Sequence, residues 1–149
     1  FKAQMKDDFE VIPSSMSGKL DLHLANGELT NFPPLKNLQL PIFKHRDFNN
    51  VRFASIDNVF TLRGQDIDIA KMAVESSVIT FFIDGVYSFN HNTNLTVQIP
   101  LSNLKRRNKD YELAKQDLDK IKGPNIFLKA IDENGQIKIK YDLFHRFKK

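Results

Sequence analysis

The sequence contains no cysteine and no tryptophan among its 149 residues. Without cysteine the chain forms no disulfide, has no thiol nucleophile and offers no cysteine ligand to a metal. No apolar run reaches the ~18 residues that a membrane-spanning helix needs. These absences exclude a disulfide-stabilised scaffold, thiol catalysis and a helical membrane span within this sequence.

Motifs that mark common enzyme and nucleotide sites are also missing. The chain has no GxSxG turn, no phosphate-binding loop and no GxGxxG segment, and its four histidines lack metal-ligand spacing. Asp66 and Asp68 could form a carboxylate pair, but their alternation with Ile67 is typical of a half-exposed strand. The aromatic motif of an RNA-recognition domain is absent. We therefore expect no enzymatic activity, no catalytic residue, no cofactor, no metal and no nucleic-acid partner.

Phenylalanine dominates the aromatic residues, with thirteen Phe against three Tyr. Phe carries no polar atom that needs a hydrogen bond, so it suits a dry environment. A Phe-rich core and a Phe-lined lipid groove both fit this composition.

Positive charge is concentrated in the last third of the chain. Residues 1–100 carry nine Lys/Arg against eleven Asp/Glu, a net charge of −2, and residues 101–149 carry thirteen against seven, a net charge of +6. Such a surface attracts anionic lipid headgroups, nucleic acid or an acidic partner, and it also fits a simple solvated face. The candidate contacts to an anionic surface are Lys105, Arg106, Arg107, Lys109, Arg146, Lys148 and Lys149.

Alternating apolar and polar residues are the main structural signal. Successive side chains of a strand point to opposite faces of a sheet, so alternation predicts strands with one wet and one apolar face. A chain of this length is expected to form one domain, residues 1–149, and to bury about 70% of its unfolded surface. The residues predicted to share one apolar sheet face are Leu20, Leu22, Leu24, Leu95, Val97, Ile99, Ile137 and Ile139.

Turn signals divide these strands. Asn26-Gly27 predicts a type I′ hairpin between strands 19–25 and 28–30, and Asp84-Gly85 predicts another hairpin turn. Asp57-Asn58 is expected to join two strands, and Ala70-Lys71 to interrupt one. Helical periodicity predicts short helices over 35–42 and 109–122. The expected fold is mainly β, with α+β character at the margin: an antiparallel curved β-meander or open β-groove with two short helices.

Residues 18–101 resemble the C-terminal region of the AsmA family, most closely its Bacteroidetes type, which is related to TamB-like β-groove proteins. The shared pattern combines a strand ending in Asn-Gly, a Phe-Pro-Leu segment, a Phe-containing strand pair and Gly-initiated strands. The residues that carry it are Gly18, Asn26, Gly27, Phe32, Leu35, Phe53, Phe60, Gly64, Ile67, Met72, Val74, Ser76 and Gly85.

The resemblance implies a periplasmic cell-envelope protein that is anchored in the inner membrane and takes part in outer-membrane biogenesis. It also implies that these residues are a fragment of a longer protein. In this interpretation the apolar sheet face binds or conducts phospholipid or acyl chains, and the basic residues contact an anionic membrane surface. The alternative is a closed-core assembly module that docks an envelope protein through a sheet edge or a basic tail.

Overall fold

The computed structural model describes residues 1–31, 46–104 and 123–143. Its main element is a seven-stranded antiparallel sheet that does not close, with the strand order β1-β4-β5-β6-β7-β8-β9. These strands are β1 (Ser17–Leu24), β4 (Ile56–Arg63), β5 (Asp66–Glu75), β6 (Thr80–Ser88), β7 (Asn94–Pro100), β8 (Asn125–Glu133) and β9 (Gln136–Tyr141). The mainly β, open antiparallel fold predicted from the alternation is confirmed. The two predicted helices, over 35–42 and 109–122, lie outside the described residues.

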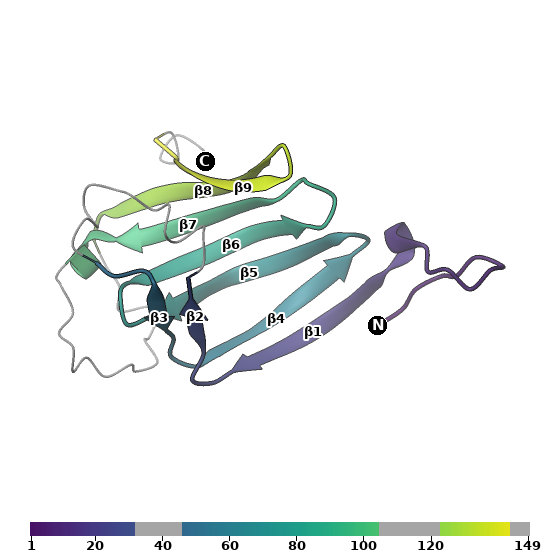
Figure 1. The fold of residues 1–149 in the computed structure, drawn as a ribbon, viewed down its shortest axis with the longest axis horizontal. Coiled ribbons are helices and arrows are strands. Elements are labelled where there is room, and N and C mark those ends of the chain that lie inside the picture. The colour runs from purple at the N-terminus through teal and green to yellow at the C-terminus, as the bar shows by residue number, and fades with distance from the viewer. Residues whose placement is uncertain (32–45, 105–122, 144–149) are drawn as a thin grey trace.

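A small second sheet covers part of the large one. It consists of β2 (Glu28–Thr30) and β3 (Asn50–Arg52), and Figure 1 shows both strands in front of the end of the large sheet where β5 ends and β6 begins. Two 3-10 turns, η1 (Pro13–Ser15) and η3 (Leu101–Leu104), complete the described elements. Within the described ranges, no helix has the length and apolar character needed to cross a membrane.

The predicted hairpin at Asn26-Gly27 is wrong. β1 pairs along its whole length with β4, and β2 pairs with β3 instead. Asn26 has a positive φ of 54°, but Gly27 does not adopt the positive φ that a type I′ turn also requires. β4 pairs with all eight residues of β1, and β2 pairs with β3 in a separate sheet.

Two other predicted turns lie inside strands. Asp57 and Asn58 belong to β4, and Asp84 and Gly85 lie in the middle of β6. Gly85 is needed there for space, because a Cβ at this position would lie 2.4 Å from the Asn94 carbonyl oxygen. The predicted interruption near Ala70 is confirmed, since the register between β5 and β6 shifts between Ile69 and Met72.

The core lies between the two sheets. Phe48, Val51 and Phe53 come from β3 and its flanks and pack in one cluster with Val74, Ile99 and Leu128 of the large sheet. Ile99 and Leu128 are each only 1% exposed. The fold is therefore anchored at one end of the sheet, where the small sheet covers it.

Candidate functional site

The strand register gathers apolar side chains on one face of the large sheet. Directly opposite residues of an antiparallel pair point to the same face, so partners can be followed from strand to strand. One such row crosses all seven strands without a charged or polar side chain: Leu20, Phe60, Ile69, Gly85, Leu95, Ala130 and Ile139. We call this surface the apolar face.

All eight residues predicted for the apolar sheet face lie on it. Leu22 and Leu24 follow Leu20 at alternate positions of β1, and the register carries the same face to Val97 and Ile99 of β7. Ile137 and Ile139 of β9 face the same way as Ala130 of β8. Other strands contribute further members of this face that were not predicted from the sequence: Ile56, Leu62, Ile67, Met72, Ile83, Tyr87, Ile126 and Leu128.

The apolar face is covered unevenly. Val74, Ile99 and Leu128 are buried beneath the small sheet, whereas the edge strands remain open to solvent. Leu20 is 56% and Leu24 40% exposed on β1, and Tyr141 is 46% exposed on β9. A soluble sheet normally hides such side chains, so the exposed members of the apolar face form a candidate binding surface.

Between these edges, the face is partly shielded. Phe60, Leu62, Ile67 and Ile69 are all half-buried, as is Tyr87 on β6. Tyr87 also packs edge-on against Phe89, with ring centroids 5.3 Å apart. A partly exposed band of aliphatic and aromatic side chains therefore runs from β1 across β4 and β5 toward β6.

The opposite face carries most of the charged strand residues together with some apolar ones, and we call it the polar face; it contains a shallow depression of about 620 Å³. Its lining combines the polar residues Asp68, Lys71, Asp84 and Gln98 with the apolar residues Val59, Val86 and Phe127. The Lys71 ammonium donates to Gln98 Oε1 at 2.7 Å and lies 5.3 Å from the centre of the Phe82 ring. The Arg63 guanidinium donates to Asp68 from Nε at 2.6 Å.

The two carboxylates considered in the sequence, Asp66 and Asp68, share this polar face. Because Asp68 is held by Arg63, it is an ion-paired strand residue, and the arrangement presents no nucleophile with an adjacent base. In the portion that the structure describes, no cluster of three or more His, Asp or Glu side chains could hold a metal ion.

A small ion-pair network lies on the polar face of the last hairpin. The Glu133 carboxylate contacts the Lys140 ammonium through Oε1 and the Lys138 ammonium at 3.2 Å through Oε2. These two ammonium groups, first Lys140 and then Lys138, hold the pKa of the Glu133 carboxyl below its ordinary value. The two lysine side chains are 51% and 53% exposed, so solvent screens the network and its contribution to stability is small.

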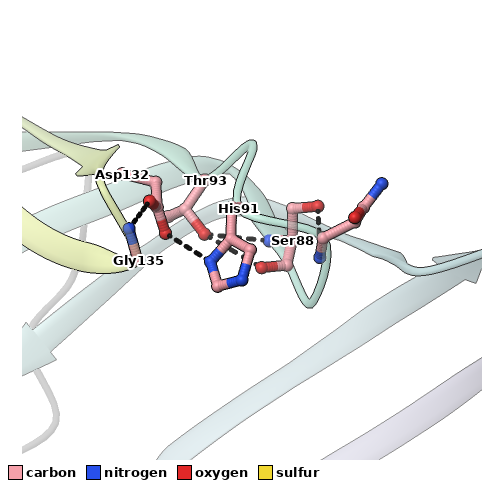
Figure 2. Close-up of polar contacts among 6 residues, drawn as sticks. Ser88, His91, Thr93, Asp132 and Gly135 are labelled. Carbon is pink, nitrogen blue, oxygen red and sulfur yellow. Dashed lines mark hydrogen bonds and ion pairs between the residues drawn. The ribbon is translucent and has the colours of Figure 1, made fainter.

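A second polar network joins two turns at the end of the sheet opposite the small sheet (Figure 2). Thr93 is buried, and its hydroxyl oxygen accepts from the Ser88 amide at 3.0 Å. The Asp132 carboxylate accepts from the Gly135 amide at 2.9 Å and lies 3.4 Å from His91 Nδ1. The network ties the connection between β6 and β7 to the hairpin of β8 and β9, and it closes this end of the sheet with polar groups.

The other sequence candidates lie partly outside the described residues. Of the four histidines, His23 contacts Asp57 across the β1–β4 pair and His91 contacts Asp132, while His45 and His145 are not described. The predicted contacts to an anionic surface, Lys105, Arg106, Arg107, Lys109, Arg146, Lys148 and Lys149, also lie outside the described residues.

Comparison with known proteins gives no match: no protein-family model, no curated protein and no solved structure resembles this chain significantly. The function is therefore inferred from the geometry of the sheet and from the residues of its two faces.

Proposed function

We propose that the chain is a non-enzymatic lipid-binding segment whose open apolar face binds acyl chains. The observation that carries this proposal is the asymmetry of that face. One row of this face is apolar across all seven strands, with Asn58 and Asp132 as polar members of neighbouring rows, and the small sheet covers the end around Val74, Ile99 and Leu128. Leu20 and Leu24 at one edge and Tyr141 at the other are left exposed.

The energetics favour a flexible apolar ligand on such a surface. Each CH₂ group that leaves water contributes about 0.8 kcal/mol, so partial burial of one acyl chain gives useful affinity. An open sheet face places few constraints on the shape of an apolar ligand. An acyl chain can follow the band from β1 toward β6 while its headgroup stays in water.

We place this activity in the cell envelope on the strength of the AsmA-like sequence pattern, which remains a prediction. In that setting the protein is periplasmic, part of a longer inner-membrane-anchored chain, and serves outer-membrane biogenesis. The seven C-terminal basic residues would contact anionic headgroups, each contributing about 1 kcal/mol near an anionic membrane.

The test compares matched substitutions on the two sheet faces. Leu20 is exposed on the apolar face, and Val59 is 45% exposed on the polar face of neighbouring β4. We expect purified protein to bind a fluorescent fatty acid saturably, with binding weakened by Leu20→Asn and unchanged by Val59→Asn. Equal effects of the two substitutions, or no saturable binding by the folded wild type, would refute the proposal.

A vesicle experiment tests the contribution of the basic residues. Co-sedimentation with anionic vesicles should fall steeply with salt, because exposed charges are screened within about 8–10 Å at physiological ionic strength. Neutralising Lys105, Arg106 and Arg107 together should weaken it further. Equal binding to neutral and anionic vesicles would contradict an electrostatic contact.

The alternative function, an assembly module that docks through a sheet edge, is favoured by one specific observation. The large sheet ends in two exposed strands, β1 and β9, and neither is capped by another described strand. Exposed edges readily accept a further strand.

A further inference from the structure

Among the described residues, the outer edge of β1 has backbone groups without a protein partner at positions that the register identifies. Ser17 exchanges both of its backbone hydrogen bonds with Lys2, at 2.7 and 2.9 Å, on the side away from β4. The β1–β4 register is continuous over eight residues, so the direction of the backbone groups alternates regularly from Ser17 onward. The amides and carbonyls of Lys19, Asp21 and His23 therefore point outward, and in the described chain Lys2 is the one residue that pairs on that side.

The side chains of the same edge are also exposed in an alternating arrangement. Leu20 and Leu24 lie on the apolar face and are 56% and 40% exposed. Asp21 and His23 lie on the polar face, where His23 contacts Asp57. The edge thus lacks proline and a bulge, two of the devices that prevent strand addition.

We propose that β1 is a self-association edge, at which a second copy of this chain pairs antiparallel about a two-fold axis at Leu22. The occupant follows from self-complementarity. In this register Asp21 lies opposite His23 of the second copy, and Leu20 lies opposite Leu24 of the second copy. Each exposed leucine of one copy therefore meets an exposed leucine of the other, and each carboxylate meets an imidazole.

Neighbouring registers are less favourable. Moving the axis to Asp21 places two carboxylates directly opposite each other, and like charges in that position are destabilising. Moving it to Leu20 sets His23 of the second copy against Ser17, whose outer edge is occupied by Lys2. The Leu22 axis avoids both conflicts and forms two pairs of backbone hydrogen bonds at the Asp21–His23 positions.

The outer edge of β9 is less suited to self-pairing than the outer edge of β1. Self-pairing of β9 about Ile139 sets Lys138 of one copy against Lys140 of the other. Both lysines already share the single carboxylate of Glu133. Pairing at β1 also keeps the apolar faces of the two copies on one side, because a two-fold axis normal to the sheet preserves its faces. The product is a single sheet with a continuous apolar face of twice the width.

A cysteine cross-link tests the axis directly, because the chain has no cysteine of its own. Leu22 would lie opposite its own symmetry mate at a position without backbone hydrogen bonds, where the Cα atoms approach to about 4.5 Å, within disulfide range. The Leu22→Cys variant should form a disulfide-linked dimer on mild oxidation. Leu20→Cys and Ile139→Cys should form no disulfide-linked dimer under the same conditions.

Cross-linking through position 20 or 139 in preference to 22 would overturn the proposed interface. So would a folded Leu22→Cys variant that cross-links no faster than the other two. Circular dichroism of the reduced variants shows that each is folded before the comparison is made.

Sedimentation velocity of the full chain in lipid-free buffer gives an independent test. The wild type should sediment faster as its concentration rises. Asp21→Pro removes an amide that points outward, which an edge strand tolerates, and should abolish this dependence. Ile137→Pro is the matched control: Ile137 is 37% exposed on the other edge strand, and because the Asp142 amide donates to Phe127 of β8, alternation directs the Ile137 amide outward as well. The control should self-associate like the wild type.

An Asp21→Pro variant that associates as strongly as the wild type would refute the proposal. No lipid is present in either experiment, so the failure of self-association and the failure of acyl-chain binding are separate outcomes.

Discussion

The uneven burial of the apolar face makes a quantitative prediction about two leucines of that face. Leu128 is 1% exposed beneath the small sheet, whereas Leu20 on edge strand β1 is 56% exposed. Truncating a buried leucine to alanine costs about 3–5 kcal/mol, because transfer free energy is lost and a cavity remains. Leu128→Ala should therefore remove a large part of a total stability that is about 5–15 kcal/mol for a typical domain.

Leu20→Ala is the matched control, because the chemistry and the sheet face are the same and only the burial differs. A half-exposed side chain leaves little cavity, so we expect a loss of less than about 1 kcal/mol. Urea titration followed by circular dichroism measures both. With a slope of about 2 kcal/mol/M, Leu128→Ala should lower the midpoint by about 1.5–2.5 M.

The comparison has a clear negative outcome. If both truncations lowered the midpoint by the same amount, Leu20 would be as well packed as Leu128. The apolar face would then be a filled core along its whole width, and the acyl-chain proposal would lose its structural basis.

Three further outcomes follow from individual contacts. Gly85→Ala should destabilise the fold by at least about 2 kcal/mol in a thermal melt, because its Cβ would lie 2.4 Å from a carbonyl oxygen; Gly123→Ala, with a similar φ and no atom within 4 Å, should cost less. Thr93→Val should cost about 1–3 kcal/mol, since it leaves a buried amide without its acceptor, and hydrogen exchange of that amide should accelerate. By NMR, the Glu133 carboxyl should titrate below its ordinary pKa, and this pKa should rise in Lys140→Ala. The contribution of Glu133 to stability is present above the ordinary glutamate pKa and is lost as the pH falls through the lowered pKa.

Much of the fold could be predicted from the sequence, because alternation reports directly on which residues share a face. The pattern around Leu20, Val97 and Ile137 gave the mainly β fold, and the shift in β5 near Ala70 followed from a break in that pattern. Strand partners could not be predicted as well. Asn26-Gly27 is a strong local turn signal, but the pairing of β1 with β4 joins residues more than thirty positions apart.

Gly85 shows a second limit of sequence reasoning. A glycine that follows an aspartate suggests a turn, but here it admits the close approach of a neighbouring strand. Both uses depend on the missing Cβ, so composition alone does not separate them. The coverage of the apolar face could not be predicted from the sequence either, because it depends on where Phe48, Val51 and Phe53 pack after the chain has folded.

The order of the strands also bears on how the chain folds. β4, β5 and β6 are joined by short turns, as are β8 and β9, so these hairpins close small loops and can form early. β1 pairs with β4 only when the loop of residues 25–55 closes, and closing this larger loop costs more conformational entropy. We therefore expect β1 to join the sheet late in folding. Its amide hydrogens should also exchange sooner than those of the central strands. The first strand of the chain would then be the last to be incorporated into the sheet.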